Sequence, residues 1–366
     1  MNSEILAIGE KALNGEKITE AQANILAKSN DLTTIGKIAD ELTINSVGKI
    51  VSFVSNIQVN YTNVCVSKCK FCAFYKNKGD SGAYTMTVDD VIAKITNAYI
   101  NNPEITEAHI VGSLNPELPL DYYENIIKQI KNKFPNIAIK AFTATEIWFL
   151  AKENNCSITE ILKRLKDAGL DFLPGGGAEI LDDELRKKLC PNKIKSDEWL
   201  TVMETAHKMG IKSNSTMLYG HIETFEDRIK HILKIRDLQE KTGGFLSFIP
   251  LSFHPLNTEL YDENLVLNPV SGADDLKVIA ISRILLNGYI NNIRAYWVML
   301  GKKLAQVALN YGANDIDGTV GEEKITYAAG GVSERVAGEG ELINLIRGAG
   351  KVPAVRGTDY KIIRQI

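Results

Sequence analysis

Three of the chain's five cysteines lie within a short stretch, NYTNVCVSKCKFCAFYK. Cys65, Cys69 and Cys72 form a C-x3-C-x2-C cluster there. Thiolates at this spacing on one loop can converge on a soft metal centre, which is either zinc or an iron–sulfur cluster. A structural zinc site usually has four protein ligands, whereas Cys156 and Cys190 each stand alone in the sequence. We therefore expect a 4Fe-4S cluster that is held by three cysteines and keeps one iron open to a small molecule.

Two other classes of site remain as alternatives at this point. A cluster that serves only electron transfer would make the protein a relay module and would need no open iron. A structural zinc site would need a fourth ligand from a distant part of the chain.

Three polar residues at the ends of apolar runs are candidates for catalysis. His254 follows the run FIPLSF and could donate to a substrate or handle a proton, or it could make a structural hydrogen bond. Arg294 could clamp a carboxylate with both arms of its guanidinium, or it could form an ion pair outside the barrel. Glu146 could bind a ribose or orient another donor, or it could stabilise a helix N-terminus.

Other residues near these runs have both a functional and a structural interpretation. The glycines at 175–177 let backbone approach a ligand closely, or they form a tight turn before Glu179. Asn214 and Ser215 are neighbours on one predicted strand, so only one of them can face inward. Aromatic residues could shield the cysteines, although core packing is their default role; they are Tyr61, Phe74 and Tyr75.

Eight β-rich apolar runs alternate with amphipathic helical stretches and supply the framework for these residues. The runs cover 49–60, 108–113, 137–144, 170–176, 211–220, 245–253, 293–300 and 314–320. Repeated strand–helix units predict parallel strands joined by right-handed crossovers. We therefore predict an α/β fold, a (β/α)8 TIM-type barrel. An open doubly wound sheet is the alternative, but the glycine-rich fingerprint of dinucleotide-binding folds is missing after the first run.

The rest of the chain predicts two additions to this barrel. Three short helical patterns between residues 4 and 48 indicate an N-terminal helical extension over 1–48, ahead of a barrel over 49–320. A tail over 321–366 contains one helix and a possible short strand, and we expect it to pack on the barrel as a cap.

Composition excludes several classes of partner. The net charge of -3 provides no broad basic field, so we expect no binding to nucleic acid or to anionic membranes. No apolar run approaches the ~20 residues that span a bilayer, and the N-terminal stretch lacks the pattern of a signal peptide. An odd number of cysteines fits a reducing compartment. These features predict a cytoplasmic protein.

The aromatic Phe71 before the third cysteine completes a C-x3-C-x-Φ-C motif, which resembles that of the radical S-adenosylmethionine enzymes. This resemblance implies a barrel, one 4Fe-4S cluster bound by Cys65, Cys69 and Cys72, and S-adenosylmethionine chelated to the open iron. The stretch MLYGHIE is similar to the latter part of the family's G-x-I-x-G-x-x-E motif, with Thr216 in place of the first glycine. The cofactor-binding residues that the resemblance implies are Phe71, Gly112, Ser113, Glu179, Leu218 and Gly220.

Longer stretches narrow the resemblance to one branch of this family. AFTATEI, LPGGGAEILDDELRKKLCPNKI, TMLYGHIET, FIPLSFHPLNTEL and IRAYWVMLG resemble the futalosine-pathway branch of menaquinone biosynthesis, which shares ancestry with deazaflavin-cofactor synthases. KAFTATEI and PLSFHPLNT are more similar to the aminodeoxyfutalosine synthases than to the dehypoxanthine futalosine cyclases.

The resemblance to the synthases implies a specific reaction. The 5'-deoxyadenosyl radical from S-adenosylmethionine, a co-substrate, would add to the enol ether of 3-[(1-carboxyvinyl)oxy]benzoate. The products would be 6-amino-6-deoxyfutalosine, methionine and bicarbonate. The expected partners are this small aryl enol-ether carboxylate and a reductant such as flavodoxin or ferredoxin.

Overall fold

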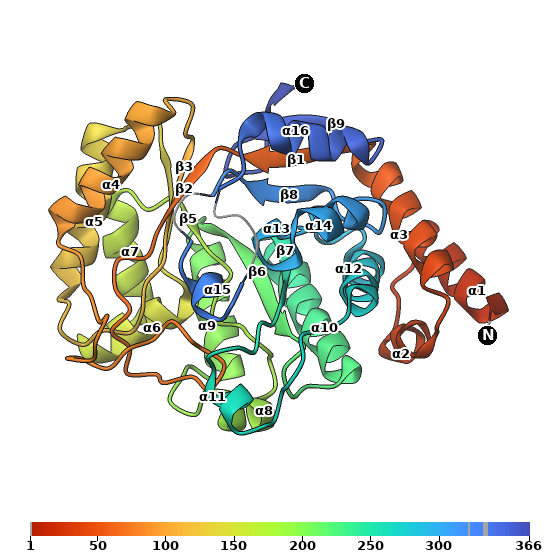
Figure 1. The fold of residues 1–366 in the computed structure, drawn as a ribbon, viewed down its shortest axis with the longest axis horizontal. Helices are drawn as coiled ribbons and strands as arrows, with labels where there is room; N and C mark the ends of the chain where they lie inside the picture. Colours follow the sequence, from red (N-terminus) through yellow and green to blue (C-terminus); the bar gives the residue numbers. More distant parts are fainter. Residues whose placement is uncertain (1, 321–322, 332–335) are drawn as a thin grey trace.

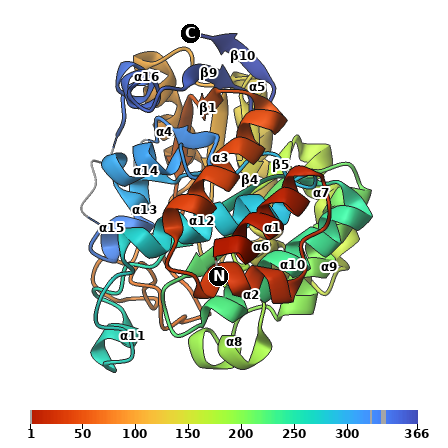
Figure 2. The same ribbon diagram turned by 90° about the vertical axis from the view of Figure 1, so that its right-hand side faces the viewer.

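The first part of the chain folds into three helices. The structure, a computed structural model, describes residues 2–320, 323–331 and 336–366. The predicted N-terminal helices are present as α1 (Asn2–Leu13), α2 (Glu20–Lys28) and α3 (Leu32–Val47). Thr19 caps α2 and Asp31 caps α3 by accepting hydrogen bonds from backbone N–H groups of the first turn. Figure 2 shows these helices side by side across one flank of the molecule, where α3 contacts α12 (Gly272–Leu286) and α2 contacts α10 (Phe225–Thr242).

Six parallel strands form the larger sheet. In spatial order they are β2 (Asn56–Val59), β3 (Glu107–Ile110), β4 (Ala138–Ala141), β5 (Phe172–Leu173), β6 (Lys212–Tyr219) and β7 (Phe245–Ser252). Every neighbouring pair is parallel, as the strand–helix alternation predicts. Because the strands run in one direction, their carboxyl ends meet at one face of the molecule, which is where barrels of this type place their sites.

A smaller sheet continues the curvature of the larger one (Figure 1). Its spatial order is β10 (Ile362–Gln365), β9 (Val352–Arg356), β1 (Ile50–Val54) and β8 (Asp315–Gly318). Two single bridges, Phe248 with Ile293 and Arg294 with Asp315, lie between β7 and β8. Together these pairings make a partial TIM-type barrel.

The predicted runs at 49–60 and 293–300 differ from the structure. The first run breaks at Ser55 into β1 and β2, because the Asn56 N–H donates to Thr319 Oγ1 (3.1 Å) and leaves the ladder of β1. The prediction of a strand over 293–300 is wrong. Only Ile293 and Arg294 form bridges, and the chain then turns into α13 (Trp297–Leu300). A short apolar run fits a buried helical turn as well as a strand.

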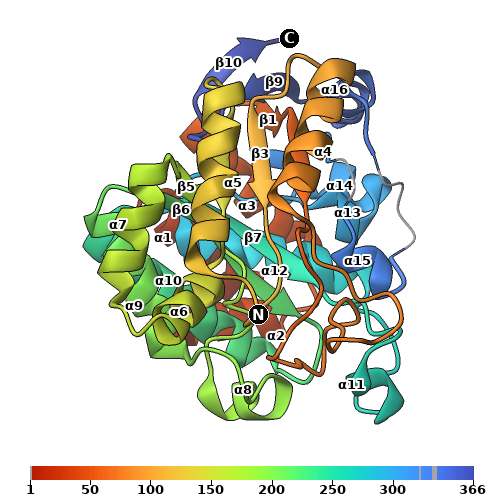
Figure 3. The ribbon, with the colours of Figure 1, turned by 90° about the vertical axis from the view of Figure 1, so that its left-hand side faces the viewer.

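Helices cover the outside of the strands. They are α4 (Val88–Asn101), α5 (Leu120–Lys133), α6 (Ala144–Glu153), α7 (Ile158–Ala168), α8 (Asp183–Leu189), α9 (Ser196–Lys208), α11 (Glu259–Asp262) and α14 (Lys302–Ala308), in addition to α10, α12 and α13. Figure 3 shows α4, α5 and α7 outside the part of the sheet that contains β3. Ser, Thr or Asp residues cap several of these helices, and Thr143 at the start of α6 forms a full capping box.

The C-terminal segment contributes strands as well as helices. It contains α15 (Ile325–Ala328) and α16 (Glu339–Gly348), and β9 then pairs in parallel with β1. Residues 321 and 322, where we expected a cap to begin, lie outside the described residues, as does Met1. Among the helices that the structure describes, none combines the length and the apolar character needed to cross a membrane.

Candidate active site

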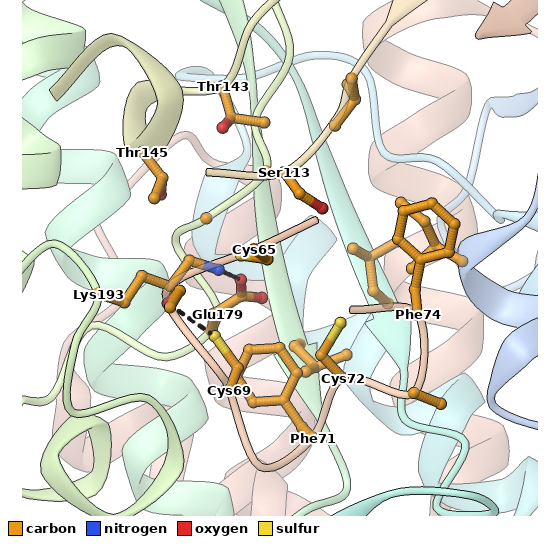
Figure 4. Close-up of a pocket in the computed structure, with 18 of the residues that line it drawn as sticks. Cys65, Cys69, Phe71, Cys72, Phe74, Ser113, Thr143, Thr145, Glu179 and Lys193 are labelled. Carbon is orange, nitrogen blue, oxygen red and sulfur yellow. Dashed lines mark hydrogen bonds and ion pairs between the residues drawn. The ribbon is translucent and has the colours of Figure 1, made fainter. Parts of the chain in front are cut away.

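A cavity of about 240 Å³ lies at the carboxyl ends of the strands, and we call it the cluster cavity. Its wall includes most of the residues predicted from the sequence as metal, cofactor or catalytic residues: Cys65, Cys69, Phe71, Cys72, Gly112, Ser113, Glu146, Glu179, Leu218 and His254. Figure 4 shows the three cysteine side chains gathered around one part of this cavity. Segments far apart in the sequence therefore meet here, because each follows a strand of the same sheet.

The loop after β2 holds the three cysteines through backbone hydrogen bonds to its neighbours. The Cys65 N–H donates to Lys76 O (3.1 Å), and the Cys72 N–H donates to Cys69 O (3.0 Å). The Lys70 N–H donates to Leu189 O (2.8 Å), which attaches the loop to the end of α8. The thiols are thus fixed on a short, braced loop rather than carried on a flexible tip.

The three thiols differ in their electrostatic surroundings. A hydrogen bond with the neighbouring Cys190 is the main cause that lowers the pKa of the Cys69 thiol to about 6, and the charge of Lys193 adds to this effect. Burial raises the pKa of the Cys72 thiol to about 12 and also raises that of Cys65. Metal binding deprotonates such thiols, and of the three surroundings those of Cys69 favour the thiolate most.

The donor set fits a cluster better than a single ion. In the described part of the chain, no three His, Cys, Asp or Glu side chains converge on a point as ligands of one metal ion must. In a 4Fe-4S cluster the cysteine thiolates bind separate irons, so their sulfurs need to line one cavity rather than share a point. Cys65, Cys69 and Cys72 meet that condition.

An ion pair beside Cys69 was not predicted from the sequence. Lys193 pairs with Glu179, and its ammonium also lies 5.4 Å from the centre of the Phe71 ring (Figure 4). Burial opposes both charges, but the pairing lowers the pKa of Glu179 and raises that of Lys193. The only sequence signal was the stretch LCPNKI, which holds Lys193 and Cys190 close together just after α8.

Glu146 lies in the wall of the cluster cavity, but protein donors already occupy its carboxylate. Oε1 accepts from the Tyr61 hydroxyl (2.6 Å) and from the Gly112 N–H (3.1 Å), and Oε2 accepts from Thr143 N–H and Oγ1 (2.7 Å each). Burial raises the pKa of this carboxyl. The geometry therefore gives Glu146 a positioning role: it connects the loop after β3 to the N-terminus of α6 and holds Gly112 in place.

Thr145 lies one residue before Glu146 and, unlike it, has a side-chain oxygen without a protein partner among the described residues. Thr145 lines the cluster cavity, and its Oγ1 is buried with no hydrogen-bond partner among the described residues. A buried hydroxyl without a partner costs about 1–3 kcal/mol, so this atom is available to a ligand of the cavity.

His254 and Arg294 occupy different surroundings. His254 lines the cluster cavity, and its Nε2 donates to Met299 O (3.0 Å), which leaves Nδ1 for another group. Arg294 is buried inside the barrel rather than outside it. It donates to Asp315 (2.6 Å), to Asp317 and to the Tyr360 hydroxyl (2.6 Å), so its fork is largely engaged by protein groups.

Gly220 does not line the cluster cavity. It has a φ of +91°, and its N–H donates to Glu223 Oε1 (2.6 Å), so it forms the turn after β6. The neighbouring Leu218 does line the cavity, and its N–H donates to Glu179 O (2.8 Å). The prediction that Gly220 contacts a cofactor therefore differs from where the structure places it.

A second cavity of about 160 Å³ adjoins the first. The two cavities share part of their walls, formed by Val111, Thr143, Gly176, Leu251, Met299, Ile325 and Thr326. The polar residues that line only the second cavity are Gln58, His109, Asn214, Thr216, Arg294, Tyr296, Asp317 and Glu323. Asn214 faces this cavity, whereas the Ser215 hydroxyl donates to Ser247 O (3.1 Å).

The glycines after β5 have a packing role as well as a place at the cavities. A Cβ on Gly175 would lie 2.7 Å from the backbone of Ser215, so this position needs glycine for the close approach of two strands. Gly176 lines both cavities. Of the aromatic residues near the cysteines, Phe74 lines the cluster cavity, and Tyr61 is buried against Tyr123 and Phe142.

Comparison with known proteins shows which family models and relatives this chain is similar to. A model of the radical SAM superfamily matches residues 59–235, and a model of the CofH/MqnC C-terminal region matches residues 242–366. The chain is 38% identical over 360 residues to the aminodeoxyfutalosine synthase of Thermus thermophilus. This alignment covers 98% of the chain and 96% of the synthase. The chain is 43% identical over 332 residues to the 5-amino-6-(D-ribitylamino)uracil–L-tyrosine 4-hydroxyphenyl transferase of Methanococcoides burtonii. This alignment covers 90% of the chain and 91% of the transferase.

Two solved structures have a similar fold. Methylornithine synthase superposes with a TM-score of 0.75 at 17% identity and covers 95% of this chain and 97% of its own. The FeFe-hydrogenase maturase HydG from Carboxydothermus hydrogenoformans superposes with a TM-score of 0.73 at 17% identity and covers 98% of this chain and 81% of its own.

Proposed function

Since this chain belongs to the radical S-adenosylmethionine superfamily and is an enzyme that uses one 4Fe-4S cluster and S-adenosylmethionine, we propose that it is an aminodeoxyfutalosine synthase. It would join the adenosyl group to 3-[(1-carboxyvinyl)oxy]benzoate and give 6-amino-6-deoxyfutalosine, methionine and bicarbonate. Membership of an enzyme family removes the alternative of a non-catalytic electron-transfer module.

One observation carries this proposal more than any other. The two stretches that are more similar to the synthases than to the cyclases both contribute residues to the walls of the two adjoining cavities. KAFTATEI supplies Thr143 and Glu146, and PLSFHPLNT supplies His254. IRAYWVMLG, which resembles the futalosine-pathway branch as a whole, supplies Arg294 and Met299. The sequence features that distinguish the subfamily therefore lie where substrates would bind, rather than on the outer helices.

In the proposed enzyme, each wall of the cluster cavity has its own role. Cys65, Cys69 and Cys72 would hold the cluster, which when bound supplies the electron that cleaves S-adenosylmethionine. Gly112 and Ser113, at the end of β3, offer backbone groups to the methionine part, and Glu146 fixes their position through the Gly112 N–H.

The second cavity would hold the aryl substrate next to the adenosyl group. Its wall is shared with the cluster cavity, which allows the two reacting carbons to be brought close together. Apolar residues such as Leu251 and Met299 lie at this shared wall and exclude water from the reacting atoms.

The transferase relatives supply a second candidate function. Several of them have a higher sequence identity to this chain than the synthase has. One transferase is 43% identical, whereas the synthase is 38% identical. Their printed name describes the transfer of a 4-hydroxyphenyl group from L-tyrosine to 5-amino-6-(D-ribitylamino)uracil. The dehypoxanthine futalosine cyclase of the same pathway is a further alternative within the family.

An anaerobic assay of the reconstituted enzyme tests the proposal. The enzyme, dithionite and S-adenosylmethionine are incubated either with the enol-ether benzoate or with L-tyrosine and 5-amino-6-(D-ribitylamino)uracil. We expect a product with the mass of 6-amino-6-deoxyfutalosine in the first mixture and no coupled product in the second. A coupled hydroxyphenyl product in the second mixture, with no turnover in the first, would replace the synthase by the transferase.

Several further features belong to this proposal. We propose that residues 1–48 form a helical extension, 49–320 a barrel and 321–366 a cap, whose strand β9 also pairs with β1. The protein would act in the cytoplasm and receive electrons from flavodoxin or ferredoxin.

A further inference from the structure

We propose that Gln58, His109 and Asn214 form a platform of uncharged hydrogen-bond donors that binds a carboxylate of the aryl substrate in the second cavity. This inference rests on the proposed function, because it assigns one end of the proposed substrate to named side chains. We call these three residues the donor platform.

The sheet register brings two members of the donor platform together, and the third lines the same cavity from a different strand. Gln58 on β2 pairs directly with His109 on β3, so the two side chains stand next to each other on the same face of adjacent parallel strands. That face is the inside of the barrel, because both residues line the second cavity. Asn214 lines the same cavity from β6.

Among the described residues, no protein group accepts a hydrogen bond from the side-chain donors of the platform. The structure gives Gln58 and His109 no side-chain hydrogen bond in the described part of the chain. Asn214 accepts from the Ser247 hydroxyl (3.0 Å) through Oδ1, which leaves the two N–H groups of its amide. Gln58 and Asn214 are only 6% and 4% exposed. Buried polar groups are almost always paired, so unpaired amides facing one cavity point to a ligand.

The cations near the platform are already paired with carboxylates. Lys140, which is in register with His109, lies 2.5 Å from Glu107. Arg294 is the only lysine or arginine among the described residues of the second cavity wall, and it pairs with Asp315 and Asp317. No free positive charge is left there for a substrate carboxylate, so neutral donors must bind it.

His109 can serve as one of these neutral donors. Burial is the main cause that lowers the pKa of its imidazole to about 3, and the charge of Lys140 adds to this effect. A neutral imidazole keeps one N–H as a donor. Two acids lie in the same wall and oppose an anion less than their charges suggest. Asp317 pairs with Arg294, Glu323 Oε1 accepts the Ile325 N–H (2.6 Å), and burial raises the pKa of both carboxyls.

The rest of the wall suits an aromatic ring. The apolar members of the second cavity are Val111, Pro174, Ile249, Leu251, Met299 and Ile325. These residues can pack against an apolar part of a ligand, and the platform can bind an acceptor group at its other end. A benzoate carries these two features in one molecule.

The test uses the reconstituted holoenzyme and benzoate as the probe. Gln58→Leu and Asn214→Leu remove the amides at similar volume, and His109→Phe removes the ring donor. We expect each change to raise KM for the enol-ether benzoate by about tenfold, which corresponds to the loss of about one hydrogen bond to a charged group. Benzoate should inhibit the wild type competitively and the variants about tenfold more weakly, whereas benzamide should inhibit all of them poorly and equally.

Two controls separate this role from a structural one. The change in the cluster spectrum on adding S-adenosylmethionine should be the same in every variant, and His109→Gln, which keeps an N–H donor, should recover most of the wild-type KM. His207→Gln is the matched control, since both ring nitrogens of this buried histidine bond to Thr242 and Ser213 (2.8 Å each) and it lines neither cavity. It should lower the melting temperature and leave KM unchanged.

Unchanged KM values and unchanged benzoate inhibition in the three platform variants would overturn the inference. A failure of the proposed function has a different signature. In that case the wild type would couple L-tyrosine and not the enol-ether benzoate, and the platform would be judged by KM for tyrosine, which also carries a carboxylate. A rise of about tenfold would support the platform and unchanged values would reject it.

Discussion

Replacing Cys69 with alanine is expected to abolish both cluster assembly and turnover. Cys69 is buried beside Cys190 and Lys193, and its thiol has the lowest pKa of the three. Without it, two of the three proposed cysteine ligands, Cys65 and Cys72, would remain among the described residues of the cluster cavity. Iron and sulfide content, visible absorption after anaerobic reconstitution, and product formation measure the effect, and we expect all of them to fall to background.

Cys156→Ala is the matched control for this prediction. Cys156 lies after α6, outside the cluster cavity, so its removal should leave iron content and activity at the wild-type level. A Cys69→Ala protein that still bound a full cluster and turned over substrate would show that the three-cysteine assignment is mistaken.

Replacing Lys140 with methionine is expected to lower the free energy of unfolding by about 3–5 kcal/mol. Lys140 and Glu107 form an ion pair with 3% and 0% exposed side chains, and removing one partner leaves the other charge buried and unpaired. The remaining cations near Glu107, chiefly Arg356, compensate only in part. Denaturant unfolding of the reconstituted protein, compared with wild type, measures the loss.

The double variant Glu107→Leu with Lys140→Met isolates the cause. Replacing both partners by apolar residues removes the unpaired charge, so most of the stability should return. The double variant should therefore be clearly more stable than Lys140→Met alone. Equal stability of the two variants would mean that the ion pair is not the source of the loss.

The parts of this molecule that depend on local sequence were predictable. The spacing of Cys65, Cys69 and Cys72 within one loop predicts a metal site, and the three residues line one cavity. The strand–helix alternation predicts a parallel sheet, and the structure has one. In each case, the residues that act together are close in the sequence.

Features that depend on three-dimensional register were not predictable in the same way. Gln58 and His109 become neighbours only through the pairing of β2 with β3, and Lys193 reaches Glu179 only because α8 folds back on the cluster loop. The sequence left open whether Arg294 binds a carboxylate of a ligand or pairs with an acid of the protein, and the acids that engage it lie on β8. The wrong prediction of a strand over 293–300 has a related cause, because a short apolar run fits a buried strand and a buried helical turn equally well.

The fate of the adenosyl group tests the central claim most directly. S-adenosylmethionine labelled with carbon-13 at the 5' carbon is incubated anaerobically with the reduced, reconstituted enzyme and the enol-ether benzoate, and the products are separated by mass. The proposed synthase predicts that the label appears in 6-amino-6-deoxyfutalosine, in an amount equal to the methionine released. Recovery of the label as 5'-deoxyadenosine, with no labelled coupled product, would contradict the account.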